Sequence, residues 1–215
     1  MEKIKREKVG IRPIFYAPML WCVPETVLKM VLHEWNVKNI FGFPSGTLDL
    51  TVTEEQIRKS FDGKWRNQLV AAEKNNITVC NDTDEFDNFV KIYEEDKKER
   101  GYEGVPDNLL LFLKDKGDVL DVYSAKDEAG TLLGFDIFYL HGKTATYLVG
   151  WNSAEGRKYY LNNLLLYKAI IGAKEKGMQT FDLGGIEDIY TESVAKFKRG
   201  TKPVEYRLAG EFVRF

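Results

Sequence analysis

A change of hydrophobic period in the second half of the chain constrains its fold more than any other feature. Three stretches rich in β-branched and aromatic residues are separated by turn residues, which predicts an antiparallel meander. A helical period that ends at a glycine follows, and then comes a short apolar strand. These segments are 119–125, 132–140, 144–151, 162–176 and 180–183. Strands on both sides of a long helix favour a mixed α/β sheet in one domain.

The first half predicts a strand followed by helices. Residues 53–56 have the form of a capping box. Apolar residues then recur every four positions from Ile57 to Leu69, and Gly63 divides this run into two helices. Further helices are expected at 25–35, 84–100, 108–116 and 193–197, and strands at 47–52, 77–80 and, as a pair about Gly210, within 204–215. We therefore expect an N-terminal extension, residues 1–44, packed on a domain of residues 45–215 with a mostly antiparallel sheet of about seven strands.

The charge balance excludes one class of function. The 215 residues include 31 Lys and Arg against 33 Asp and Glu, a formal net charge of −2. Duplex DNA binding needs a basic face whose phosphate contacts dominate affinity, so a dedicated duplex-binding role is excluded. Basic residues nevertheless gather in residues 196–207. Contact with a single RNA end, such as that of a tRNA, therefore stays open.

The cysteines and histidines point to no metal site. Cys22, Cys80, His33 and His141 stand far apart, without the spacing of zinc ligands. We expect both cysteines to be packing residues of a reduced, cytoplasmic protein, although a Cys/His pair could still meet in the fold. His141 lies in a predicted tight turn and is not expected to act as a base. No run of about twenty apolar residues occurs, so no membrane span is expected.

Three segments of the chain carry a resemblance to a known family. They are 64–69 (KWRNQL) with 72–74 (AEK), then 162–165 (NNLL) through 173–177 (AKEKG) to 181–185 (FDLGG), and finally 197–200 (FKRG) before the strand around Tyr206. In this order they resemble FemAB-like proteins, the peptidoglycan-bridge aminoacyltransferases and their relatives in the GNAT acyltransferase superfamily. The resemblance covers residues 47 to 215.

The resemblance implies an α/β GNAT fold and an enzyme that transfers an aminoacyl group to an amine, with aminoacyl-tRNA as donor and no bound cofactor. Family members that act on the cell wall usually have two GNAT-like domains, and this chain has length for one. The acceptor therefore stays open among a peptidoglycan precursor, another envelope sugar, a peptide and a small metabolite. Oligomeric state is not predicted.

The donor loop distinguishes two kinds of GNAT enzyme. Members that use CoA carry a Q/R-x-x-G-x-G/A loop whose backbone N–H groups cradle the pyrophosphate before the long helix. Here Tyr160 and Asn162 occupy the glycine positions, which argues against acyl-CoA. One alternative is still a CoA-dependent N-acetyltransferase that acts on an amino sugar or amine. The other is a degenerate GNAT domain that only binds a partner.

Two residues are predicted to be catalytic. Lys198 matches the lysine of the family's F-K motif, where a cation could stabilise the oxyanion or a tRNA phosphate; the alternative is an exposed lysine in a basic segment. Asp182 ends a buried strand, where α/β folds place ligand contacts; the alternative is a cap of the next turn. Gly184 and Gly185 would let backbone approach a substrate or adopt positive φ.

Six further residues are predicted to bind substrate: Arg66, Asn67, Trp151, Asn162, Phe197 and Arg199. For Arg66 and Asn67, on the polar side of a helix, the alternative is solvation at the surface. For the two aromatic residues, the alternative is a place in the core.

Overall fold

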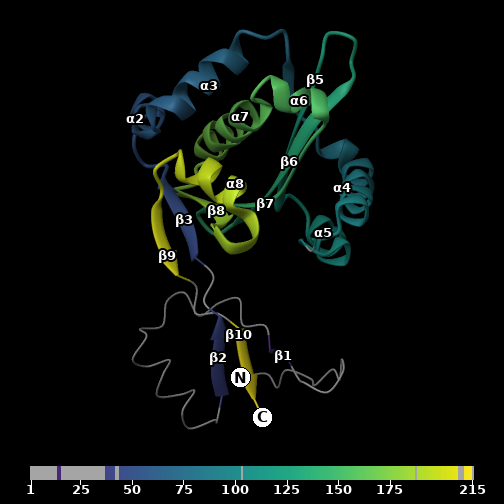
Figure 1. Cartoon of the computed structure of the whole chain (residues 1–215), viewed down its shortest axis with the longest axis vertical. Helices are drawn as coiled ribbons and strands as arrows, with labels where there is room; N and C mark the ends of the chain where they lie inside the picture. Colours follow the sequence, from purple (N-terminus) through teal and green to yellow (C-terminus); the bar gives the residue numbers. More distant parts are fainter. Residues whose placement is uncertain are drawn as a thin grey trace.

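A computed structural model describes residues 14–15, 37–41, 44–102, 104–186, 188–207 and 211–214. Within them, a seven-stranded sheet with the order β4-β5-β6-β7-β8-β3-β9 lies between two groups of helices (Figure 1). Its neighbouring strands are antiparallel except β7 and β8, which are parallel. The strands are β3 (Pro44–Asp49), β4 (Thr78–Asn81), β5 (Leu120–Lys126), β6 (Leu132–His141), β7 (Thr144–Asn152), β8 (Thr180–Gly185) and β9 (Val204–Arg207).

The predicted fold class is confirmed. The protein is a single GNAT-like α/β domain whose mixed, mostly antiparallel sheet is flanked by helices. The predicted meander is present as β5, β6 and β7, which pair antiparallel in sequence order. The register between β6 and β7 shifts once, between Ile137 and Phe138.

Helices cover both faces of this sheet (Figure 1). The helices α2, α3 and α7 lie on one face, and α4 and α5 lie on the other. The helices are α2 (Glu54–Ser60), α3 (Gly63–Glu73), α4 (Phe86–Arg100) after the 3₁₀ turn η2 (Thr83–Glu85), α5 (Asp107–Lys114), α6 (Ala154–Lys158), α7 (Leu161–Glu175) and α8 (Asp188–Arg199). No helix in the described part of the chain is both long and apolar enough to cross a membrane.

The first two of these helices begin as the sequence predicts. The Thr53 side chain accepts a hydrogen bond from Gln56 N, and the Gln56 side chain accepts one from Thr53 N, so the capping box is complete. Asp62 caps α3 in the same way. The helix α3 begins at Gly63, so the run of apolar residues is divided into two helices at this glycine, as expected.

Apolar residues form a separate core on each face of the sheet. The larger core joins α2, α3 and α7 to the sheet and contains the four-residue repeat from Ile57 to Leu69. The smaller core packs α4 and α5 against β5, β6 and β7 around Phe89 and Phe135. Because both faces are covered, a charged side chain inside β6 or β8 is taken out of water.

A second sheet of three strands has the order β1-β10-β2, with antiparallel pairs. Its strands are β1 (Ile14–Phe15), β2 (Val37–Phe41) and β10 (Glu211–Arg214). The two terminal strands that we expected as one pair therefore belong to different sheets, because β9 pairs with β3 and β10 with β2. The helix expected at 25–35, Cys22 and His33 lie outside the described residues, and the domain boundary at residue 45 stays a prediction.

Other expectations need correction. The strand expected at 47–52 ends at Asp49, because the Asp49 side chain accepts hydrogen bonds from the amide and hydroxyl of Thr51 and forms a turn. The helix expected at 193–197 extends over α8, from Asp188 to Arg199. Cys80 is a free, exposed thiol and not a packing residue, because β4 is an edge strand.

Candidate active site

The two parallel strands at the centre of the sheet separate part of the way along. They pair over Thr144–Thr146 of β7 and Thr180–Asp182 of β8. Beyond this pairing β7 continues to Asn152, and β8 continues to Gly185 beside β3. Asp182 lies where the strands part. A split of this kind gives a ligand access to backbone in the middle of a covered sheet.

Lys198 extends from α8 into this split. Its side chain is only 8% exposed, which excludes the alternative of a solvated surface lysine. Its Nζ donates to the carbonyl of Gly185 at 3.0 Å and lies 5.2 Å from the centre of the Tyr147 ring. Burial lowers the pKa of Lys198 to about 8, against the opposing charges of Asp182 and Asp136. The structure thus holds an ammonium in a desolvated place beside the parting strands.

Asp182 is 1% exposed and accepts hydrogen bonds from three groups on three elements. The Ser45 hydroxyl lies 2.7 Å from Oδ1, the Gly184 amide donates to Oδ1 at 2.8 Å, and the Tyr206 hydroxyl donates to Oδ2. The aspartate therefore caps the turn after β8, as one interpretation expected, and also ties that turn to β3 and β9. It faces Lys198 as a counter-charge.

Gly184 adopts the left-handed conformation, with φ of 68°, while Gly185 does not. A Cβ at Gly184 would lie 2.9 Å from the Tyr147 carbonyl oxygen and 3.7 Å from Lys198 Nζ. Glycine is thus required here both by the conformation and by the close approach of β7.

The structure adds two residues that the sequence analysis missed, Asp136 of β6 and Tyr147 of β7. Asp136 is 1% exposed, and its Oδ1 accepts a hydrogen bond of 3.1 Å from the Tyr147 hydroxyl. Burial raises the pKa of Asp136 to about 8. The one sign of this site in the sequence is an acidic residue inside the apolar strand 132–140. Its partners Tyr147 and Lys198 come from other elements of the fold, so the three residues form no local sequence motif.

A pocket of about 280 Å³ lies at the N-terminus of α7, between α3 and α8. Its charged lining is mostly basic, with Lys64, Arg157 and Lys196 against Asp62. The first turn of a helix leaves backbone N–H groups unpaired, and its dipole favours an anion. The pocket therefore has the charge and the backbone donors to hold phosphate.

Two of the predicted substrate-binding residues, Asn162 and Phe197, line this pocket. Phe197 lines it and stacks on Trp65, which also lines it, at 6.0 Å between ring centres. Asn162 lines it and accepts a hydrogen bond from Asn152 of β7. Asn67 is exposed on α3, and Arg199 pairs with Glu205 at 2.8 Å.

Two predicted residues make structural contacts away from the pocket lining. Arg66 donates to the carbonyls of Lys59 and Phe61, at 2.7 and 2.6 Å, and so caps the end of α2. Trp151 stacks on Phe135 and packs against the smaller core, in agreement with the alternative of a core aromatic. Their role in substrate binding stays a prediction. His141, with Nε2 2.8 Å from Thr146 Oγ1, is half-buried, and burial lowers its pKa.

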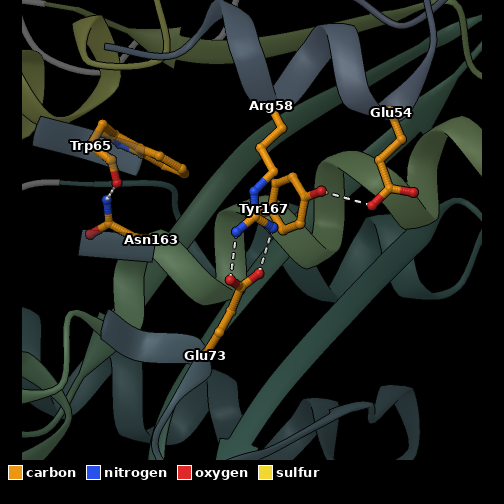
Figure 2. A network of polar contacts seen from close by, with 6 residues as sticks. All are labelled: Glu54, Arg58, Trp65, Glu73, Asn163 and Tyr167. Atoms are coloured by element: carbon orange, nitrogen blue, oxygen red, sulfur yellow. Dashed lines mark hydrogen bonds and ion pairs between the residues drawn. The ribbon is translucent and has the colours of Figure 1, made fainter. Parts of the chain in front are cut away.

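Two residues of the KWRNQL–AEK motif, Trp65 and Glu73, join α3 to neighbouring helices (Figure 2). The two Arg58 amino groups donate to both carboxylate oxygens of Glu73, at 2.7 and 2.6 Å, and so join α2 to α3. The guanidinium also lies over the Tyr167 ring of α7. Asn163 of α7 donates to the carbonyl of Trp65. These contacts join α2, α3 and α7, and the hydrogen bond of Asn163 holds the first turn of α7 against α3 beside the pocket.

The solved structures similar to this chain share its fold. The crystal structure of FemX has a TM-score of 0.71 and 17% identity, covering 88% of this chain and 68% of FemX. Two further structures each have a TM-score of 0.59. The C-terminal domain of a putative lysylphosphatidylglycerol synthetase from Agrobacterium fabrum is 16% identical, covering 88% of this chain and 65% of that one. The structure of L-PGS from Bacillus licheniformis is 15% identical, covering 86% of this chain and 64% of that one.

Comparison of sequences points to the same fold. No curated protein matches the chain significantly. Residues 58–199 match the family described as "Acetyltransferase (GNAT) domain". This range contains both separating strands, Lys198 and every residue of the pocket lining except Gly200, and the likeness to FemX agrees with the FemAB-like motifs. The chain belongs to this GNAT family and is an acyltransferase.

Proposed function

We propose that the protein transfers an aminoacyl group, or another acyl group, from an activated donor to an amine, and that the donor is aminoacyl-tRNA. The observation that carries the proposal is the buried Lys198 ammonium where β7 and β8 part. The acceptor would be the amino group of a cell-envelope precursor, a peptide or a small metabolite. Since charged tRNA is a cytoplasmic donor, the reaction would take place in the cytoplasm.

The chemistry needs stabilisation of negative charge. When the amine attacks the donor carbonyl, a C–N bond forms and the carbonyl oxygen becomes an oxyanion. An ammonium has three hydrogens, and in the described part of the chain Lys198 donates one of them, to Gly185. The other two can bind the oxyanion. Asp182 would act through the turn that it holds, and so position Lys198 and Gly185. Collapse of the intermediate then breaks the bond from carbon to the ester oxygen, which takes a proton as it leaves.

The pocket at α7 supports a donor that carries phosphate. Three basic side chains and the first turn of α7 surround a space of about 280 Å³. At its edge, Tyr160 has φ of 54° and is 44% exposed, where a CoA-binding loop has glycine. A bulky residue there hinders the close approach of a pyrophosphate to backbone, which favours the 3′ end of a tRNA.

One observation favours a second candidate, an acyl-CoA-dependent N-acetyltransferase that acts on an amino sugar or amine. The matched family is described as an acetyltransferase domain. Acetyl-CoA also carries phosphates that would suit the basic pocket.

Calorimetric titration with a charged tRNA and, separately, with acetyl-CoA tests the donor. We expect the charged tRNA to bind with micromolar affinity or better, and acetyl-CoA to bind far more weakly. Uncharged tRNA shows the contribution of the aminoacyl group, and the double variant R157Q/K196Q is the control for the pocket. Micromolar binding of acetyl-CoA without binding of tRNA would overturn the tRNA proposal. Binding of neither would favour a non-catalytic domain.

A further inference from the structure

Asp136 is a buried carboxylate without a complete set of hydrogen bonds. Its Oδ1 accepts from the Tyr147 hydroxyl at 3.1 Å, and its Oδ2 has no hydrogen-bond partner among the described residues. Burying a polar atom without a partner destabilises a fold, so such an atom calls for an explanation. The transfer chemistry above gives Asp136 no part.

The local backbone is arranged so that Tyr147 can reach this carboxylate. Gly150 of β7 is the sheet partner of Asp136. A Cβ at Gly150 would lie 1.9 Å from the Tyr147 hydroxyl oxygen and 2.8 Å from Asp136 Oδ1. A side chain at this position would therefore displace the hydrogen bond. The Tyr147 ring is held by stacking on Phe138, with 5.2 Å between ring centres.

The same tyrosine connects Asp136 to the lysine of the site. Lys198 Nζ lies over the Tyr147 ring, and the charges of Lys198 and Asp136 influence each other. The titratable groups around Asp136 are Tyr147 from β7, Lys198 from α8 and Tyr123, its sheet partner on β5, while Asp182 of β8 faces Lys198. Burial and the neighbouring carboxylate raise the pKa of Tyr147 well above its usual value, so this hydroxyl stays protonated.

We propose that Asp136 receives the proton that the acceptor amine loses, and that the Tyr147 hydroxyl relays this proton to it. This proposal rests on the proposed acyl transfer. Asp136 is too deeply buried to touch the amine, whereas Tyr147 is half-buried and its hydroxyl lies beside the exposed Gly150. The attacking nitrogen gives a proton to the Tyr147 oxygen while the Tyr147 hydrogen moves to Asp136. Tyr147 stays neutral and Asp136 becomes neutral. Reversal of the relay returns the proton to the leaving oxygen, so atoms and charge balance.

The pH dependence of kcat tests the relay. Asp136 must be ionised to accept a proton and Lys198 must be charged to bind the oxyanion, so kcat should rise toward pH 8 and fall above it. We expect D136N and Y147F to lose the acid limb and to lower kcat at pH 8 by about 10²-fold. The control is D121N, which neutralises a carboxylate buried elsewhere beside Lys176 and should keep the wild-type profile. An acid limb retained in D136N would overturn the relay.

A second measurement needs no substrate. The carbonyl band of a protonated carboxyl group, followed by infrared spectroscopy, should disappear in the wild type with a midpoint near pH 8 and be missing from D136N. Y147F should move the midpoint upward, because the Tyr147 hydrogen bond lowers the pKa of Asp136. A midpoint below pH 6 would overturn the proposal. Should no donor support turnover while the band titrates near pH 8, the proposed function is wrong and Asp136 still holds a proton at the site.

Discussion

The buried Lys198 destabilises the folded state, because a buried ammonium loses its hydration. The attraction of Asp182 and Asp136 offsets only part of this loss, as the lowered pKa of Lys198 indicates. We expect K198M, which keeps the length and removes the charge, to lower kcat by about 10² to 10³-fold. The melting temperature should stay the same or rise. Steady-state kinetics and calorimetry measure both, with K168M on the exposed side of α7 as control. Normal turnover in K198M would remove Lys198 from the catalytic machinery.

The raised pKa of Asp136 predicts that the stability of the fold depends on pH. This pKa is about 3.9 in an unfolded chain and about 8 in the fold. Between these values the folded state binds more protons, so its contribution to stability falls as pH rises, by up to about 1.4 kcal/mol per pH unit. Asparagine does not titrate. We expect D136N to gain stability relative to the wild type between pH 5 and pH 8 in urea denaturation. A constant difference across that range would show that Asp136 is ionised throughout.

Some residues of the site could be identified from the sequence alone, and others could not. Lys198 and Asp182 stand in short motifs beside glycines, and a resemblance carried over a few positions was enough to select them. The pairing of Asp136 with Tyr147 depends on the β6–β7 register and on the missing side chain at Gly150. A register shift between Ile137 and Phe138 changes which residues of β6 and β7 lie opposite each other, and the pattern of apolar residues in the sequence does not reveal this shift.

At the scale of the element, the start of α7 stores strain beside the pocket. A left-handed conformation costs a bulky residue such as Tyr160 roughly 1 kcal/mol or more. Asparagine adopts this conformation at a lower cost than other residues with a side chain. We therefore expect Y160N to raise the free energy of unfolding by about 1 kcal/mol, measured by urea denaturation. The matched control is K158N in the neighbouring exposed α6, which has no strain to relieve. A loss of stability in Y160N would show that the Tyr160 side chain contributes more than its backbone costs.

Elements with strong local signals were predictable, and those decided by distant contacts were not. The capping box, the break at Gly63 and the meander depend on neighbouring residues, and all three are confirmed. The end of β3 depends on one aspartate that turns the chain at Thr51. The exposure of Cys80 follows from the place of β4 at the edge, which only the strand order of the whole sheet decides.

At the scale of the whole molecule, a net charge of −2 is an average over unlike regions. The basic groups Lys64, Arg157 and Lys196 come from three different elements and meet only at the pocket. The composition alone excluded a protein that coats nucleic-acid duplexes. The fold nevertheless gathers enough positive charge at the pocket to bind one single-stranded end. Charge contacts of this kind steer association and weaken with salt.

The affinity for charged tRNA should therefore depend steeply on salt. For single-stranded nucleic acid, the slope of log K against log salt is about −0.7 for each phosphate contacted. If Arg157 and Lys196 each contact one phosphate, R157Q and K196Q should each make the slope about 0.7 less negative, and the double variant about 1.4. The control K91Q removes an exposed charge from α4, on the opposite face of the sheet, and should leave the slope unchanged. Fluorescence titrations between 50 and 300 mM salt, on the order of physiological strength, measure these slopes. Equal slopes in all four variants would place the tRNA contacts away from the α7 pocket.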